Sequence, residues 1–257
     1  MHRDISHAIT VGFQNMQSHL DDDVRSIEAM YTHPSYYNET FTNAFAVIQL
    51  TNSSSLTFVT LNSDPNVPGI ASQVTSLGAG GGSTMRNTLQ QVPLVALDKP
   101  QCEASRNPAG LAYIVDNSTM CAQGSELAAM NGFCEDDWGG PLILERGDDN
   151  ATTVQDHLQV GITSWTFGCG SGSPGVFSRV SDGYEWIRTI ICEHSIAPPT
   201  YLACVARDDA DNVNQNVQVP HVSSAPLVPI AFQYEVGMDG YFYENGTTLM
   251  CLVCCAR

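Results

Sequence analysis

The sequence predicts an all-β fold. Hydrophobic residues make up 43% of the 257 residues and charged residues 14%, well below the roughly 25% that is usual for globular chains. Glycine and proline, present 21 and 13 times, punctuate the chain throughout. Short apolar runs stand between polar turn segments, as expected of buried strands. These observations favour one large β domain, with or without an appendage, over a helical bundle.

Three strands are expected in the first fifty residues. Ala8 to Gly12 has the pattern of a short strand that ends at glycine. Val24 to Met30 carries apolar residues three positions apart, a spacing that also suits a helical turn, and we interpret it as a strand. The apolar run from Asn43 to Leu50, bounded by polar loops, predicts a buried strand.

A short helix is predicted near residue 190. Asp182 and Glu185 have the spacing of a helix cap and its reciprocal partner. Tyr184, Ile187 and Ile191 recur three and four residues apart, which gives the helix one apolar face.

The last sixty or so residues differ in kind. Pro198-Pro199 resembles a linker, and the segments 232–236 and 249–253 are candidate short strands in a polar, proline-interrupted tail. We therefore expect two parts, a domain over 1–195 and a cysteine-containing extension over 196–257 whose fold the sequence does not specify.

The charge of the chain excludes several functions. Ten Lys plus Arg stand against 27 Asp plus Glu, a formal net charge of −17. Such a field repels phosphate backbones and anionic lipid surfaces, so we expect no nucleic-acid partner. No run of about 20 apolar residues occurs, so no membrane span is expected. The sequence indicates no cofactor.

Cysteines and glycosylation motifs point to an extracellular or secretory location. The nine cysteines spread over positions 102 to 255, which favours a disulfide framework in an oxidising compartment over a zinc site. However, Met1 to Leu20 lacks the apolar core of a signal peptide, so we expect either an incomplete secreted protein or one that is not secreted. Candidate glycosylation sites are Asn38, Asn52, Asn117, Asn150 and Asn245.

The stretch Cys134 to Leu142, which reads CEDDWGGPL, carries the most specific motif. Two glycines before a proline describe a tight loop that feeds a strand. The stretch resembles the nucleophile loop of the chymotrypsin/trypsin-like serine proteases, C-x-G-D-S-G-G-P. Trp138 occupies the serine position and Asp136 the first glycine position, so the resemblance implies a retained loop without its nucleophile.

Further blocks of this family follow in order. The sequence HPSY before the predicted strand at 43–50 resembles the family's HPxY block, and the alignment places the catalytic aspartate at Ala44. Other matches are Val74–Gly78, where the family has V-T-G-W-G, Met120-Cys121-Ala122, the GITSWTFGC stretch ending at Cys169, and PGVFSRV at Pro174–Val180.

The resemblance covers roughly Ile9 to Cys192. It implies two six-stranded antiparallel β-barrels of the trypsin-like type, the first incomplete at its amino end, followed by a short C-terminal helix and an extra C-terminal segment.

Disulfide pairings also follow from the resemblance. It implies the pairs Cys102–Cys121 and Cys134–Cys169, and Cys192 with Cys204 is a candidate third bridge. The tail sequence CLVCC, at positions 251, 254 and 255, has CxxC spacing that also suits a metal or redox site. Because no second ligand pair stands at matching spacing, we favour a disulfide or free thiol and expect no metal.

The family's chemistry needs a hydroxyl nucleophile, an imidazole base and a carboxylate that orients it. Trp138 and Ala44 supply neither hydroxyl nor carboxylate, and the family's TAAHC histidine block is absent. His2, next to Arg3, is a weak candidate for the missing histidine.

The specificity pocket is altered as well. The resemblance places Gly132 at the pocket base, which removes support for a basic specificity, and Thr166 where a glycine keeps the mouth open. Ser164, Trp165 and Thr166 form a candidate peptide groove.

The oxyanion loop comprises Asp136, Asp137 and Trp138. Asp136 places a negative charge beside the oxyanion donors. Asp137 lacks the I-V-G-G amino terminus that pairs with it in the family, so we expect a zymogen-like or otherwise altered loop.

Three hypotheses remain open on the sequence. The first is a catalytically impaired protease homologue that acts by binding a protein or peptide. The second is an active trypsin-like endopeptidase in a fuller-length form. The third is a gene fragment without a defined role.

Overall fold

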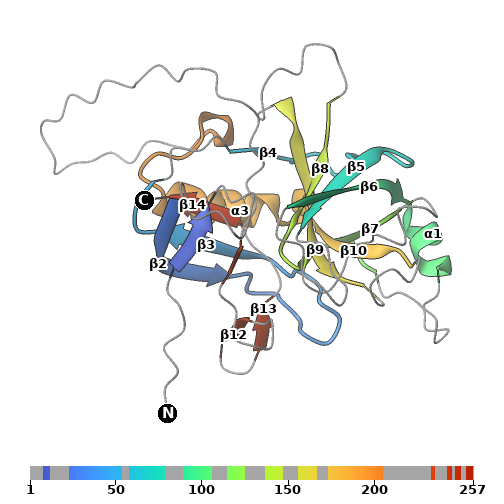
Figure 1. Cartoon of the computed structure of the whole chain (residues 1–257), viewed down its shortest axis with the longest axis horizontal. Coiled ribbons are helices and arrows are strands. Elements are labelled where there is room, and N and C mark those ends of the chain that lie inside the picture. The colour runs from blue at the N-terminus through green and yellow to red at the C-terminus, as the bar shows by residue number, and fades with distance from the viewer. Residues whose placement is uncertain are drawn as a thin grey trace, which may run out of the picture.

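The structure is a computed structural model in which strands predominate, as predicted (Figure 1). The helices among the described residues include α1 (Lys99–Ala104), α3 (Val180–His194) and the short 3-10 turn η3 (Thr200–Leu202). The structure describes residues 8–11, 23–53, 58–78, 89–105, 115–124, 137–146, 156–166, 173–204, 233–234, 242–244, 247–249 and 253–256.

Six antiparallel strands close into a barrel. Their order is β10-β7-β6-β5-β8-β9, and β9 pairs again with β10 to complete the circle. The short strand β4 (Thr60–Leu61) adds to β9 in parallel. The six barrel strands are β5 (Gln73–Gly78), β6 (Gln90–Leu97), β7 (Thr119–Gln123), β8 (Pro141–Leu144), β9 (Leu158–Trp165) and β10 (Gly175–Arg179).

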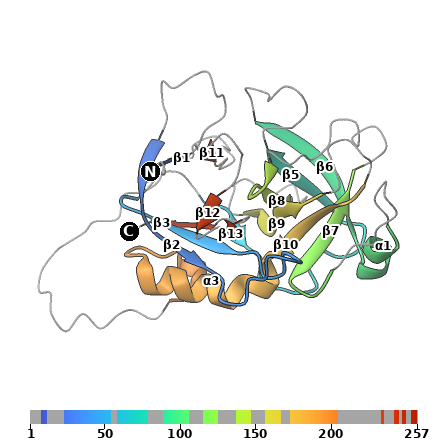
Figure 2. The same ribbon diagram turned by 90° about the horizontal axis from the view of Figure 1, so that it is seen from below.

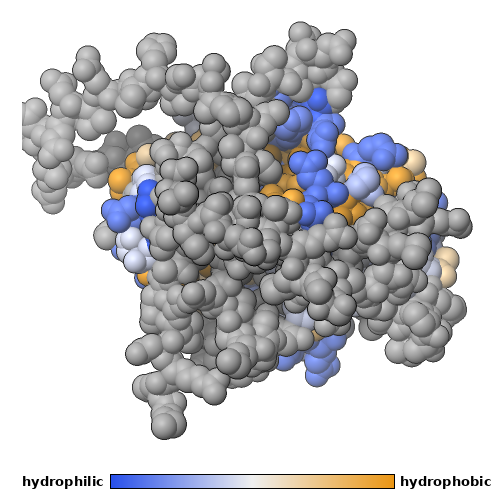
Figure 3. Space-filling view, viewed as in Figure 1, coloured by the Kyte–Doolittle hydropathy of each residue, from blue (hydrophilic) through white to orange (hydrophobic). Residues whose placement is uncertain are grey.

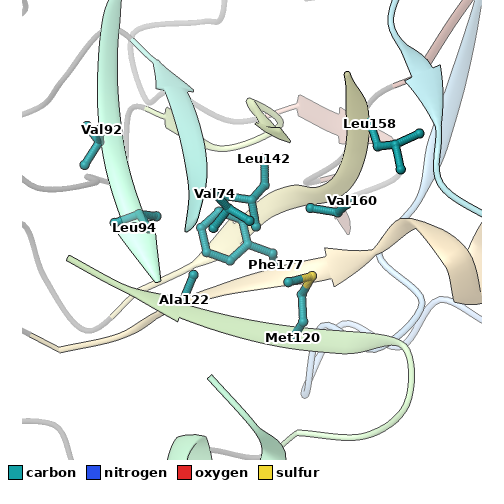
Figure 4. Packing of buried hydrophobic residues seen from close by; sticks show 9 residues of the cluster. All are labelled: Val74, Val92, Leu94, Met120, Ala122, Leu142, Leu158, Val160 and Phe177. Atoms are coloured by element: carbon teal, nitrogen blue, oxygen red, sulfur yellow. The ribbon is translucent and has the colours of Figure 1, made fainter. Parts of the chain in front are cut away.

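Alternating apolar side chains fill the barrel interior (Figure 4). On β6, Val92, Leu94 and Ala96 are buried while Gln91 and Pro93 between them are exposed. Full burial of a large apolar side chain stabilises the fold by about 1.5–3 kcal/mol. The cluster comprises Val74, Val92, Leu94, Met120, Ala122, Leu142, Leu158, Val160 and Phe177.

A second sheet has the order β11-β1-β2-β3-β14. Strands β1 (Ala8–Val11), β2 (Asp23–Thr32) and β3 (Ala46–Leu50) are antiparallel and confirm the three strands predicted there. Within the described residues this sheet stays open, so a second closed barrel is not seen there.

Short strands from the C-terminal extension occupy both edges of the second sheet. β11 (Gln233–Tyr234) pairs with β1, and β14 (Val253–Ala256) pairs in parallel with β3. β12 (Phe242–Glu244) and β13 (Thr247–Leu249) form a separate hairpin. The strand expected at 249–253 is therefore wrong in its bounds, because β13 ends where that prediction begins.

Helix α3 runs alongside β2 and β3 (Figure 2). Phe45 and Val47 pack with Val180 and Ile187 of the helix in a core that also contains Ile162 of the barrel. This second core joins the two sheets. Its buried members are Phe45, Val47, Leu61, Ile162, Val180, Ile187, Ile191 and Leu202.

The predicted start of α3 is wrong by three residues, since a cap at Asp182 would begin the helix at Gly183. The helix begins at Val180, and its N-cap residue Arg179 makes no side-chain capping hydrogen bond. Val180 is fully buried, so core packing draws this residue into the helix. Asp182 is not the cap but lies in the first turn, where its charge suits the helix dipole.

Two disulfides fix the helices. Cys102–Cys121 joins α1 to β7, the pair that the family resemblance implied, and Cys192–Cys204 joins α3 to the segment after η3. Cys134 and Cys169 lie outside the described residues, as do Cys251 and the side chains of Cys254 and Cys255.

The described surface mixes hydrophilic and hydrophobic residues over the barrel (Figure 3). Among the candidate glycosylation sites, Asn38, Asn52 and Asn117 are exposed, whereas Asn150 and Asn245 lie outside the described residues. In the described part of the chain, no helix is long and apolar enough to cross a membrane.

Candidate functional site

The loop from Asp137 to Gly140 depends on its two glycines. Gly139 has a φ of 83°, in the left-handed region that disfavours other residues. A Cβ added to Gly140 would lie 2.5 Å from the carbonyl oxygen of Leu77. Pro141 follows as the first residue of β8. The tight loop predicted from the sequence is confirmed, and its glycines have a structural reason that is independent of catalysis.

Strand β9 holds this loop in place. The Gly139 amide donates to the Thr163 carbonyl at 2.9 Å, and the Thr163 amide donates to the Gly140 carbonyl at 2.8 Å. A further bond from the Gly140 amide to the Asp137 carbonyl, 3.0 Å, tightens the turn. The loop therefore lies directly beside the strand that ends in the candidate groove, Ser164–Thr166.

Trp138 presents a half-buried indole at the position that the resemblance assigns to the nucleophile. An indole carries no hydroxyl or thiol and forms no acyl intermediate. The loop retains its backbone hydrogen bonds without the atom that would react.

Asp137 is 5% exposed, and its side chain packs against the Cα of Gly78 so closely that a Cβ there would overlap the carboxylate. Gly78 is thus required by this contact, which sequence analysis did not identify. Gly132 and Asp136 lie outside the described residues, so the altered pocket base and the zymogen-like loop stay predictions.

Ala44, to which the family resemblance assigns the catalytic aspartate, lies two residues before β3 and is 2% exposed. The preceding Asn43 adopts a φ of 52°, which asparagine tolerates better than most residues. Its amide donates to the Ser118 hydroxyl at 2.9 Å, and the Ser178 hydroxyl donates to the Ala44 carbonyl at 3.0 Å. The backbone is fixed by several bonds, but the methyl group cannot orient an imidazole.

Two buried hydroxyls of β9 lack a hydrogen-bond partner among the described residues. Thr163 and Ser164 are both fully buried, and neither hydroxyl has a hydrogen-bond partner within the part of the chain that the structure describes. Ser164 is the extra residue of a bulge, since Val176 opposes Trp165 and Phe177 opposes Thr163. An unsatisfied buried hydroxyl costs about 1–3 kcal/mol.

The remaining predicted site residues are less well defined. Trp165 and Thr166 are half-buried at the end of β9. His2 lies outside the described residues. Among the residues that the structure does describe, no group of three His, Cys, Asp or Glu could hold a metal ion.

Comparison of the sequence with known proteins finds relatives that are named as inhibitors. Glucanase inhibitor protein 3 of Phytophthora infestans is 32% identical over 187 residues, covering 71% of this chain and 67% of that protein. Glucanase inhibitor protein 3 of Phytophthora sojae (strain P6497) is 32% identical over 196 residues, 73% of this chain and 69% of that protein.

A relative named as a protease also matches. Trypsin beta of Drosophila erecta is 29% identical over 168 residues, 63% of this chain and 60% of that protein. The family model for trypsin matches residues 2–187. The chain therefore belongs to the trypsin family.

Proposed function

We propose that this chain acts by binding rather than by proteolysis, and that it inhibits a secreted glucanase. The observation that carries the proposal is Trp138, an indole in the nucleophile position of an otherwise well-formed loop. Proteins named as glucanase inhibitors that share 32% of their residues with this chain over about 70% of its length supply the class of partner.

Loss of hydrolysis rests on two substitutions that act together. Members of a catalytic triad work as a unit, so the absence of one costs several orders of magnitude in rate. Here the hydroxyl and the carboxylate are both replaced, by Trp138 and Ala44. An indole at the nucleophile position also takes up space that a scissile carbonyl would need.

A binding role is supported by what is retained. The chain keeps the scaffold on which family members bind peptides. This scaffold consists of the barrel, the loop Asp137–Gly140 and the strand end Ser164–Thr166. Tryptophan is among the residues most enriched at binding hot spots, because its large rigid ring buries much area at little entropic cost. We therefore place Trp138 at the centre of the partner-binding face.

An extracellular site of action is part of this proposal. Disulfides such as Cys102–Cys121 and Cys192–Cys204 persist in oxidising compartments and are rare in the cytosol. The exposed motifs at Asn38, Asn52 and Asn117 are accessible to glycosylation.

The test combines an inhibition assay with an activity probe. The purified full chain is titrated into endo-β-1,3- and endo-β-1,4-glucanases while release of reducing ends is followed, and affinity is measured by surface plasmon resonance. A fluorophosphonate probe is applied in parallel. We expect inhibition of at least one glucanase class and no serine labelling.

Two variants locate the binding face. Trp138→Ala removes the indole and should weaken binding by roughly tenfold or more if Trp138 is a hot spot. Ile196→Ser changes an exposed apolar residue, 75% exposed and outside the loop, and should leave binding unchanged. Fluorophosphonate labelling would refute the loss of catalysis. Failure to bind any glucanase would refute the partner while leaving the loss of catalysis intact.

A further inference from the structure

A cavity lies outside the loop Asp137–Gly140. It is a cavity of about 440 Å³ between the start of α1, the start of β7 and the junction of β10 with α3. Figure 2 shows α1 beside β7 and β10 at one end of the barrel. None of its lining residues belongs to the loop 137–140 or to the strand end 164–166.

Arg179 brings an unpaired charge to this cavity. Its backbone amide donates to the Ser118 carbonyl at 2.8 Å, which fixes the start of the side chain. The half-buried guanidinium makes no hydrogen bond or ion pair with any residue that the structure describes. Burial lowers the pKa of Arg179, and the charge of Asp182 partly offsets this shift. A partly desolvated charge without a partner is unfavourable, so a bound counter-charge would stabilise it.

More hydrogen-bond donors line the same cavity. The Ser181 hydroxyl is buried and also lacks a partner within the described residues. Both residues line the cavity at the start of the 15-residue helix α3, whose N-cap makes no side-chain capping bond. The first amides of such a helix favour negative charge. Lys99 also lines the cavity and adds a second cation, whose ion pair with Glu103 at 3.6 Å is exposed.

Three carboxylates also line the cavity, and two of them accept hydrogen bonds through one oxygen each. Asp116 accepts from the Ser118 amide at 2.9 Å and from the Ser118 hydroxyl at 2.7 Å. Asp98 accepts from the Gln101 amide at 2.6 Å. Asp182 is exposed at the first turn of α3. The Arg179 guanidinium and the Ser181 hydroxyl nevertheless keep donors without a partner among the described residues, and a bound anion would accept from these donors.

We propose that this cavity binds an oxyanion group, a sulfate or a carboxylate, between the Arg179 guanidinium and the Ser181 hydroxyl. The proposal is independent of glucanase inhibition, because the two sites share no residue. Arginine suits this task since its planar fork pairs with two oxygens of one oxyanion.

The test measures anion binding to the full chain at constant ionic strength. Sodium sulfate and N-acetylaspartate amide are titrated separately by isothermal calorimetry, with chloride as the balancing salt. Specific binding of either probe is expected, and the tighter one identifies a tetrahedral or a planar oxyanion as the natural group. Arg179→Gln should weaken it roughly tenfold or more, the loss expected for a charge-assisted hydrogen bond.

Three further variants keep the test decisive. Ser181→Ala should weaken binding less than Arg179→Gln, and Asp182→Asn should tighten it by removing a repelling charge. Arg146→Gln removes the same charge from an exposed residue that does not line the cavity and should have no effect. Equal binding by wild type and Arg179→Gln, or no binding of either probe at millimolar concentration, would overturn the proposal.

Discussion

The closed barrel and the sheet β1–β2–β3 bury their apolar residues in different ways. The barrel encloses its own core, a cluster of nine residues that includes Phe177 and is supplied by the six strands. The sheet has no such enclosure among the described residues, and its core residues Phe45 and Val47 pack against helix α3 and Ile162. The barrel is therefore self-sufficient, whereas the sheet depends on the helix that follows the barrel in sequence.

This difference explains how the loop at Asp137–Gly140 stays intact while chemistry is lost. The loop is bonded to Thr163 within the barrel. Ala44, in contrast, lies at the boundary between the two halves, where Ser178 of β10 binds its carbonyl. A triad built across this boundary needs both halves in place, but a binding face built on the barrel needs only one.

The largest loss of stability is expected from removing a buried ring from either core. Phe177→Ala and Phe45→Ala each remove a fully buried ring and should each lower the free energy of unfolding by about 3–5 kcal/mol. Hydrogen exchange distinguishes the halves. Phe45→Ala should lower amide protection in β2 and β3 while the barrel stays protected, and Phe177→Ala should lower protection in the barrel. Equal loss throughout for both variants would show that the halves unfold as one unit.

Opening a disulfide in each half should have the next largest effect. Cys192–Cys204 closes a loop with a sequence separation of 12 and Cys102–Cys121 one of 19. In the chain-entropy model each contributes about 3 kcal/mol. Paired Cys→Ala variants measured by urea denaturation should therefore lose similar stability. The loss of Cys192–Cys204 should also release the η3 segment that covers the second core, seen as faster proteolysis after Ser195. Unchanged proteolysis would contradict the dependence of that core on η3.

Glycine substitution probes the loop itself. Gly140→Ala places a methyl group 2.5 Å from the Leu77 carbonyl oxygen and 2.9 Å from that of Asp137, so it should cost about 1–3 kcal/mol. Gly69→Ala is the matched control, because its methyl group would meet only the Ser72 hydroxyl at 3.7 Å. A Gly140→Ala variant as stable as this control would show that the loop can rearrange. It would contradict the conclusion that the close approach to Leu77 requires glycine at position 140.

Local signals made much of the fold predictable. The apolar run before Leu50 and the glycine pair before Pro141 each specify their own structure, since burial and positive φ are properties of those residues. The start of α3 was not predictable, because Val180 joins the helix through packing with residues far away in the sequence.

Long-range contacts also hid part of the site. Gly183 is a poor helix former, and only the structure shows that a Cβ there would meet the Phe45 ring at 2.8 Å. Likewise, the orphaned hydroxyl of Ser164 depends on which groups surround a bulge. The sequence indicated which positions depart from the family motif, but not that the Ser164 hydroxyl lacks a partner among the described residues.

Two buried serines at the boundary between the halves should respond in opposite directions. Both Ser164 and Ser178 are fully buried. Ser178→Ala removes the hydrogen bond to the Ala44 carbonyl and should cost about 1 kcal/mol or more. Ser164→Ala removes a hydroxyl without a described partner and should be neutral or stabilising by up to about 1 kcal/mol. Thermal unfolding of the pair checks this, and a destabilising Ser164→Ala would show that its hydroxyl has a partner after all.

His33 should give the smallest effect, a pH dependence of the contact between β2 and α3. Its ring contacts the Trp186 ring edge-on, with 4.9 Å between the ring centroids, and its Nδ1 accepts a hydrogen bond from the Ser35 amide at 3.2 Å. Burial lowers the pKa of His33 below 6.5, and the charge of Asp182 opposes this shift only partly.

Because the folded pKa of His33 is depressed, the unfolded chain binds its proton more readily, and stability should fall as pH decreases through and below about 6.5. Protonation also removes the acceptor that Ser35 uses. Urea denaturation at about pH 7.5 and about pH 5.5 should show a smaller loss in His33→Gln than in wild type. Equal losses in both proteins would mean that other groups set the acid sensitivity, and that the end of β2 is held to α3 by apolar packing alone.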